Sequence, residues 1–229
     1  MSLLLREGER GLIIGQTGSG KTAGATVMID KSPIYPKILI DTKGEPKFDR
    51  FLDGKNIHVE SFGEFAKLRP KTMPDYVVIR PNPMELLEPG IIDGYLARVY
   101  NHGRPCLLYV DELYQVHGST GRAGVGLKGV LTRGRSKGIT CLMGAQRPSW
   151  IARECLTESQ KFYIYRILDK RDRKSLSEII PNFDRMTPAE KYHFYAYDAG
   201  EDSPKYYKPF EYQDVTMPDS IRLKTDGWI

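Results

Sequence analysis

The stretch Gly15-Gln16-Thr17-Gly18-Ser19-Gly20-Lys21-Thr22 decides the fold class, because it matches the pattern G-x-x-x-x-G-K-[ST] in full. A strand-like apolar run ends at its first glycine and a helical pattern starts at Lys21, which is the context that a phosphate-binding loop requires. Glycines let the backbone wrap so that successive N–H groups point at phosphate oxygens, and the helix start adds partial positive charge. All these residues are predicted to bind a nucleoside triphosphate, with Lys21 on the β- and γ-phosphates and the Thr22 hydroxyl on Mg²⁺.

Two acidic residues supply the second part of such a site. The apolar run Cys106–Val110 ends in Asp111 and Glu112. Asp111 is predicted to bind Mg²⁺ through water, and Glu112 to act as the general base on the attacking water. Simple P-loop kinases and GTPases usually lack this glutamate, so the pair favours a hydrolase with an additional catalytic glutamate. Gln146 follows the apolar run Thr140–Ala145 and is predicted to contact the γ-phosphate or the attacking water, a buried structural amide being the alternative.

The apolar runs predict an α/β fold. They alternate with helical or loop-rich intervals, as in a mostly parallel sheet flanked by helices. Strands are expected at Gly11–Gly15, Lys37–Asp41, Ile57–Val59, Tyr76–Ile79, Cys106–Val110, Thr140–Ala145 and Phe162–Ile167. Helices are expected at Lys21–Asp30, Glu64–Leu68 and Pro89–Tyr100.

The C-terminal part of the chain has a different pattern. Tyr192–Tyr197 and Tyr206–Tyr212 flank the polar turn Asp198–Pro204, which predicts an antiparallel β-hairpin. Tyr192, Tyr195 and Tyr197 have the spacing of strand residues, so we expect their side chains to pack or to line an interface. No repeat or linker divides the chain, and we expect one domain over residues 1–229, with a core at 11–176 and an extension at 177–229.

Composition excludes several classes of protein. The 229 residues are 40% hydrophobic and 28% charged, which is typical of a globular chain and unlike a disordered one. No apolar run approaches the ~20 residues of a transmembrane helix, and Leu3-Leu4-Leu5 is too short for a signal peptide. The three cysteines are odd in number and lack metal-ligand spacing. We expect a reduced, cytoplasmic protein without a transmembrane segment.

The net charge of +5 is unevenly distributed. Residues 121–175 contain 13 Lys and Arg against 4 Asp and Glu, whereas residues 1–120 contain 15 of each sign. A polyanionic partner would meet the middle segment. Charge alone distinguishes neither nucleic acid from nucleotide phosphates nor a bound partner from a solvated basic face.

Several motifs in order resemble one family. GQTGSGKT is followed by ILIDTKGE (Ile38–Glu45), LLYVDEL (Leu107–Leu113) and RGRSKGITCLMGAQRPS (Arg133–Ser149), and then by FYIYRI and the charged DKRDRKSL within Lys161–Leu176. This order is similar to that of FtsK/HerA-type DNA-pumping ATPases and covers about Gly11 to Leu176. The stretch G-R-x-x-G-I with its following Q-R-P is the most discriminating part.

The resemblance implies a RecA-like (ASCE) P-loop fold, ATP and Mg²⁺ as ligands, and a homo-oligomeric ring, commonly of six subunits, around double-stranded DNA bound without sequence preference. Lys21, Thr22, Asp111 and Glu112 match the phosphate, metal and base positions, and Gln146 matches the sensor. In this family an arginine before the fourth core strand reaches the neighbouring subunit's site. Arg133 and Arg135 are the candidates for this arginine finger, the alternative being surface residues of a basic helix.

The motif starts fifteen residues from the N-terminus, so we expect neither the barrel or membrane segments of larger members nor their C-terminal winged helix. The chain thus resembles the short genome-packaging ATPases of internal-membrane-containing viruses. That implies packaging of DNA into a preformed capsid, a capsid-vertex or viral membrane protein as a partner, and a location in the host cytoplasm or with the virion.

One segment is the candidate for DNA contact. Gln115–Gly129 contains five glycines in fifteen residues, which argues against a helix throughout and predicts a mobile loop that carries Arg122 and Lys128. In a ring motor such a loop can face the pore and grip phosphates without reading bases. A loop without a partner is the alternative.

Two other functions are compatible with a phosphate-binding loop. A nucleotide kinase would use the loop, but would leave Glu112 and Gln146 without a role. A P-loop ATPase that acts as an assembly or secretion factor, like zonula-occludens-toxin-like phage proteins, would share the core without pumping DNA. DNA-stimulated hydrolysis would distinguish the motor from such a factor, and phosphate transfer to an acceptor instead of water would indicate the kinase.

Overall fold

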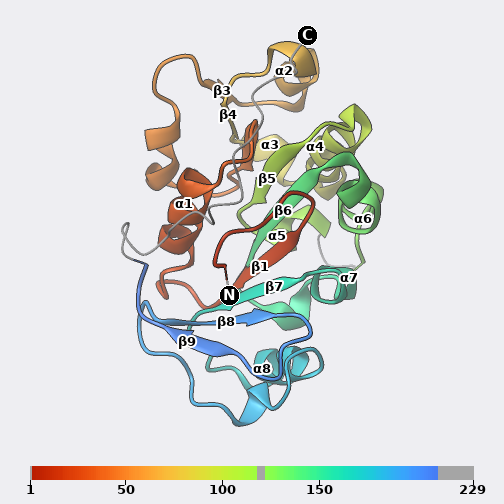
Figure 1. Cartoon of the computed structure of the whole chain (residues 1–229). Coiled ribbons are helices and arrows are strands. Elements are labelled where there is room, and N and C mark those ends of the chain that lie inside the picture. The colour runs from red at the N-terminus through yellow and green to blue at the C-terminus, as the bar shows by residue number, and fades with distance from the viewer. Residues whose placement is uncertain (1, 118–121, 211–229) are drawn as a thin grey trace.

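The chain folds around one sheet, which has nine strands in the part that the computed structural model describes, residues 2–117 and 122–210 (Figure 1). The order across the sheet is β3-β4-β2-β5-β6-β1-β7-β8-β9. The strands are β1 (Arg10–Ile14), β2 (Lys37–Ile40), β3 (Ile57–Val59), β4 (Tyr76–Ile79), β5 (Cys106–Val110), β6 (Ile139–Ala145), β7 (Lys161–Ile164), β8 (Phe194–Asp198) and β9 (Lys205–Tyr207). Every strand that the apolar runs predict is present.

The first seven strands are parallel, which places their carboxyl ends at one edge of the sheet. Strand β6 lies between β1, which leads into the phosphate-binding loop, and β5, which leads into Asp111. The register pairs Ile14 with Ala145 and Val110 with Met143, so the last residues of the three strands lie side by side. The side chains that follow these strands therefore converge.

Helices cover both faces of the sheet, as Figure 1 shows. They are α1 (Lys21–Lys31), α2 (Phe62–Lys67), α3 (Pro83–Leu86), α4 (Pro89–His102), α5 (Leu113–His117), α6 (Val125–Arg133), α7 (Arg153–Thr157) and α8 (Lys170–Ser177). Side chains of the strands alternate between two cores: Ile13 packs with α1, whereas Leu12 and Ile14 pack with α4 to α7. Burial on both faces explains why these strands are continuously apolar. Among the described residues, no helix has both the length and the apolar character to cross a bilayer.

The predicted C-terminal hairpin is confirmed, and it extends the main sheet. Strand β8 pairs antiparallel with β7, and β9 pairs antiparallel with β8. Strand β8 begins at Phe194, so Tyr192 precedes the strand, in contrast to the prediction from its spacing. Glu211 and Tyr212, the last two residues of the predicted second strand, lie outside the described residues.

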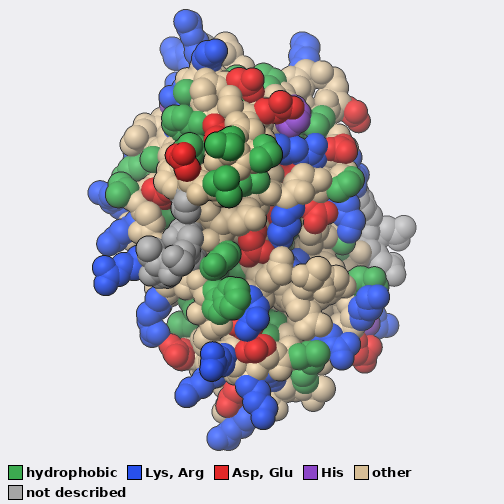
Figure 2. Space-filling view, turned by 180° about the vertical axis from the view of Figure 1, so that it is seen from behind, with side chains coloured by type: hydrophobic (Ala, Val, Ile, Leu, Met, Phe, Trp, Pro, Cys, Tyr) green, Lys and Arg blue, Asp and Glu red, His purple; other side chains and the backbone are tan. Residues whose placement is uncertain are grey.

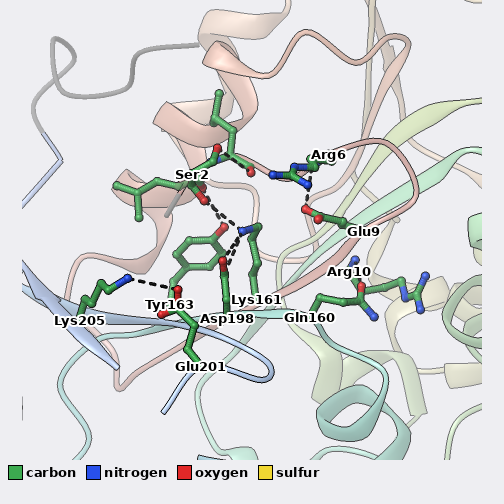
Figure 3. A network of polar contacts seen from close by, with 12 residues as sticks. Ser2, Arg6, Glu9, Arg10, Gln160, Lys161, Tyr163, Asp198, Glu201 and Lys205 are labelled. Carbon is green, nitrogen blue, oxygen red and sulfur yellow. Dashed lines mark hydrogen bonds and ion pairs between the residues drawn. The ribbon is translucent and has the colours of Figure 1, made fainter. Parts of the chain in front are cut away.

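The N-terminal segment is tied to β7 and β8 by a polar network (Figure 3). The buried Lys161 places its ammonium 2.8 Å from Asp198 Oδ1 and 3.1 Å from the Ser2 carbonyl oxygen. The Tyr163 hydroxyl donates to the Leu3 carbonyl at 2.8 Å. A buried ammonium needs such partners, since an unpaired charge in the interior is costly.

The prediction of a loop throughout Gln115–Gly129 is wrong, because α6 begins at Val125 and contains Lys128. Gly126 and Gly129 are buried where α6 packs on α4, and a Cβ at Gly126 would collide with the Asp93 carbonyl oxygen. Asp93 also caps α6, since its carboxylate accepts from the backbone N–H groups of Gly126 and Leu127 at 2.8 Å each. Close packing and this remote cap outweigh the low helix propensity of glycine. The part of the segment at residues 118–121 lies outside the described residues.

Candidate nucleotide site

The phosphate-binding loop is held between the ends of β6 and β7. The Gly15 N–H donates to the Ala145 carbonyl at 3.2 Å, and the Gln16 N–H donates to the Arg166 carbonyl at 3.1 Å. Gly18 and Gly20 have φ values of 75° and 110°, a region that favours glycine. The Ser19 hydroxyl oxygen is buried and has no hydrogen-bond partner among the described residues. The loop is thus a preformed cradle with free hydrogen-bonding capacity.

Lys21 lies over this cradle at the start of α1. Its ammonium donates to the Gln16 carbonyl at 3.1 Å. Burial, and then the neighbouring charge of Lys43, lowers the pKa of Lys21 to about 8. The phosphate oxygens of a bound nucleotide would offer negatively charged partners that stabilise the charged form of this ammonium. Thr22 follows on the first turn of α1.

The two acids at the end of β5 are almost completely buried. Asp111 is 3% exposed and Glu112 is 6% exposed. The Tyr109 hydroxyl donates to Asp111 Oδ1 at 2.9 Å, and burial raises the pKa of Tyr109 well above its ordinary value. Gly144 on β6 is required beside them, because a Cβ there would collide with the Asp111 carbonyl oxygen. The close approach of β5 and β6 fixes both carboxylates.

Gln146 links the acids to the phosphate-binding loop. Its backbone N–H donates to Glu112 Oε1 at 3.4 Å, while its side-chain Oε1 accepts from the Thr17 hydroxyl at 2.8 Å. The structure therefore brings together the loop, Glu112 and Gln146, as the sequence predicts for their positions. Their catalytic roles remain predictions.

Lys43 is a site residue to which the sequence analysis gave no role. Its ammonium lies 3.1 Å from Glu112 Oε2 and 3.4 Å from Asp111 Oδ2. Burial lowers the pKa of Lys43, but the charges of Asp111 and Glu112 and hydrogen bonds to them raise it overall. Asp41 shapes the loop that carries Lys43, since its carboxylate accepts from the Lys43 and Glu45 N–H groups. The sequence feature that could have identified Lys43 is its position shortly after β2, the strand that pairs with β5.

The oxygen ligands suit a magnesium ion. Asp111 Oδ2 is buried and has no hydrogen-bond partner among the described residues, although Lys43 pairs with it electrostatically. A carboxylate and a hydroxyl are hard oxygen donors of the kind that Mg²⁺ takes beside substrate phosphates. The Asp111 carboxylate and the Thr22 hydroxyl are therefore suitable oxygen ligands for Mg²⁺.

The candidate arginine fingers lie elsewhere. Arg133 ends α6 with its guanidinium 5.4 Å from the centre of the Tyr100 ring, and Arg135 lies against Gly8. Both are exposed and precede β6, whose carboxyl end is at the site. A seven-residue strand spans roughly 20 Å. Neither arginine therefore reaches the site of its own chain.

The two DNA-contact candidates are exposed, Lys128 on α6 and Arg122 just before it. The structure brings neither into the nucleotide site. Their proposed contact with DNA stays a prediction.

The chain is 27% identical over 220 residues to the DNA packaging ATPase P9 of Enterobacteria phage PRD1, covering 91% of this chain and 90% of P9. It is a homologue of P9. The resemblance inferred from the motifs is thereby confirmed. No family model matches the chain.

The fold is shared with solved structures of other ATPases. The genome packaging NTPase B204 of Sulfolobus turreted icosahedral virus 2, in complex with sulfate, superimposes with a TM-score of 0.71 over 90% of this chain and 99% of B204, at 15% identity. VirB4 of Thermoanaerobacter pseudethanolicus gives a TM-score of 0.63 at 11% identity, over 88% and 89% of the two chains. B204 is also solved in complex with AMPPCP and with ATP-γS. The predicted RecA-like P-loop fold is confirmed.

Proposed function

We propose that this protein hydrolyses ATP to move double-stranded DNA into a preformed viral capsid. The observation that carries the proposal is the Gln146 bridge, which joins Thr17 of the phosphate-binding loop to the buried Glu112. A kinase has no need for a carboxylate and an amide beside the phosphate-binding loop. The homologue P9 is named as a DNA packaging ATPase, which supports the coupling to DNA.

Each site residue has a separate proposed role in the binding and hydrolysis of ATP. The N–H groups of Gly15 to Thr22 and the Lys21 ammonium bind the phosphates of ATP. Glu112 accepts the proton of the attacking water, and Gln146 orients that water or the γ-phosphate. Thr22 and Asp111 would hold Mg²⁺, which neutralises phosphate charge when bound. Lys43 balances the acids and fixes their direction.

Charge and position support the proposed ring and the proposed DNA contact. Because neither Arg133 nor Arg135 reaches its own site, we propose that one of them completes the site of a neighbouring subunit in a ring. Lys and Arg side chains lie along much of the outline in Figure 2, with small exposed hydrophobic patches between them. Contacts of such cationic side chains with DNA phosphates would hold the DNA without reading its sequence. Arg122 and Lys128 are the proposed contacts, and a capsid-vertex or viral membrane protein is the proposed anchor.

Steady-state hydrolysis of ATP, with and without linear double-stranded DNA and across protein concentrations, tests this function. We expect stimulation by DNA and a steep dependence on protein concentration, since a trans arginine requires assembly. Hydrolysis that ignores DNA would favour an assembly or secretion factor. Phosphate transfer to an acceptor other than water would reveal a kinase.

A further inference from the structure

Lys43 forms ion pairs with both acids of the nucleotide site. Its ammonium lies 3.1 Å from Glu112 Oε2 and 3.4 Å from Asp111 Oδ2. The other oxygen of each carboxylate has its own partner: Asp111 Oδ1 accepts from the Tyr109 hydroxyl at 2.9 Å. Glu112 Oε1 accepts from the Gln146 N–H at 3.4 Å. Two adjacent buried carboxylates need positive charge beside them, and Lys43 supplies it at the two remaining oxygens.

The charge of Lys43 also acts on the phosphate-binding loop. Burial, and then the charge of Lys43, lowers the pKa of Lys21, so the two ammonium groups lie close enough to repel each other. Lys21 in turn donates to the Gln16 carbonyl inside the loop. A phosphate group bound in the cradle would therefore be attracted by both lysines.

The Lys43 side chain has room to move although its backbone is fixed. Its N–H donates to Asp41 Oδ1 at 3.3 Å, and the same carboxylate accepts from the Glu45 N–H. The side chain is 30% exposed and borders a cavity of about 210 Å³ that Glu112 and Gln146 also line. This cavity has room for several waters, since one water needs roughly 10–15 Å³. The flexible four-carbon stem can thus shift the ammonium away from the acids without a change in the fold.

Lys43 acts with opposite sign on a free metal ion and on the complex of that ion with a triphosphate. The ammonium repels a free divalent cation that approaches the two acids. The complex of Mg²⁺ with ATP is negatively charged overall, so the same ammonium attracts it. Nucleotide sites usually bind Mg²⁺ through one or two carboxylates together with the substrate phosphates. The arrangement therefore favours an ion that arrives with its phosphates.

We propose that Lys43 makes the site selective for the metal–triphosphate complex, because it occupies Asp111 and Glu112 as an internal counter-ion until that complex binds. The inference rests on the proposed function, since it assumes that the cradle holds a triphosphate and that Asp111 holds the ion. Lys43 is a positioning residue, which acts through the two acids. Free divalent cations are kept from the acids by its charge.

The test compares free Mn²⁺ with the complex of Mn²⁺ and AMPPCP, a triphosphate analogue that is not hydrolysed. Mn²⁺ takes the same oxygen ligands as Mg²⁺. Dissociation constants for the full chain are measured by electron paramagnetic resonance for free Mn²⁺ and by calorimetry for the complex. Lys43→Met and Lys43→Gln remove the charge, so each should bind free Mn²⁺ about tenfold or more tightly than the unmodified chain without binding the complex more tightly.

Two controls separate the charge of Lys43 from other effects of the substitution. Lys43→Arg keeps the charge and should bind free Mn²⁺ as weakly as the unmodified chain. Lys47→Met removes a nearby exposed lysine and should change neither constant. Asp111→Asn combined with Lys43→Met should lose the gain in Mn²⁺ binding, because the ion then lacks its carboxylate. A gain that persists in this double variant places the ion elsewhere and overturns the inference.

Neutral variants that bind free Mn²⁺ no more tightly, or that tighten both ligands equally, also overturn the inference and leave the nucleotide site standing. Circular dichroism checks that each variant folds, and the unmodified chain supplies a test that needs no substitution. If it binds free Mn²⁺ as tightly as the AMPPCP complex, the site has no such selectivity. If it does not bind the complex at all, the proposed function itself is refuted, and this inference with it.

Discussion

The lysine of the phosphate-binding loop should destabilise the protein when no nucleotide is bound. Burial, and then Lys43, lowers the pKa of Lys21 from 10.5 to about 8. At about 1.4 kcal/mol for each pH unit between these values, keeping the ammonium charged at pH 7 costs at most ~3.5 kcal/mol. Lys21 is only partly buried, so screening by solvent reduces this figure. Its hydrogen bond to the Gln16 carbonyl returns about 1 kcal/mol.

Lys21→Met, which keeps the length and removes the charge, is therefore expected to stabilise the nucleotide-free protein by about 1–2 kcal/mol at pH 7. For a chain of this size that raises Tm by about 2–8 °C. The same variant should lose ATP binding, because the phosphates lose their ammonium partner. Stability would be measured by thermal and urea unfolding without nucleotide, with the exposed Lys55→Met as the matched control.

The pH dependence has a definite sign. Because the pKa of Lys21 is lower in the folded than in the unfolded protein, the cost of its charge is complete below pH 8. It disappears between pH 8 and 10.5 as folded Lys21 becomes neutral. The gain of Lys21→Met over the unmodified chain should shrink from pH 7 to pH 10. A variant that is no more stable at pH 7, or whose gain is the same at both pH values, refutes this reasoning.

Three further predictions test the site and its surroundings. Glu112→Gln should bind ATP but lose about 10³-fold or more of its hydrolysis rate, measured by calorimetry and phosphate release, and full turnover would reject Glu112 as the base. Arg133→Ala or Arg135→Ala, whichever is the finger, should be inactive alone yet regain activity when mixed with Glu112→Gln subunits, whereas a finger acting within its own chain would show no recovery. Arg122→Ala combined with Lys128→Ala should abolish DNA stimulation and keep basal hydrolysis, and undiminished stimulation would remove both residues from the DNA contact.

The sequence predicts the strands and the centre of the site because both depend on local patterns. A strand buried on both faces must be apolar throughout, and the phosphate-binding loop needs glycine and lysine at fixed spacing. Asp111, Glu112 and Gln146 follow such strands directly, and parallel strands bring their ends to one edge. Site residues at the ends of strands can therefore be identified from the sequence before the order of the strands in the sheet is known.

Contacts that depend on packing could not be predicted in the same way. Low helix propensity argued for a loop over Gln115–Gly129, yet α6 forms because Asp93, on another helix, caps it at 2.8 Å and its glycines fit against α4. Tyr192 has the spacing of a strand residue, but its N–H donates a hydrogen bond to the Ser19 carbonyl and not to a neighbouring strand. Each of these outcomes depends on a partner far away in sequence, which no local window contains.

The role of Lys43 depends both on a local sequence pattern and on the pairing of strands that are distant in the sequence. Its position after β2 is a local signal of the same kind as Asp111 after β5, but its role requires knowing that β2 and β5 are neighbours. Once they pair, the ammonium falls 3.4 Å from Asp111 Oδ2, which has no hydrogen-bond partner among the described residues. Asp111 would therefore hold Mg²⁺ in the immediate neighbourhood of the Lys43 ammonium. Since Asp41 holds the Lys43 loop and Arg80 pairs with Asp41 at 2.9 Å, the end of β4 is connected to the site through three successive polar contacts.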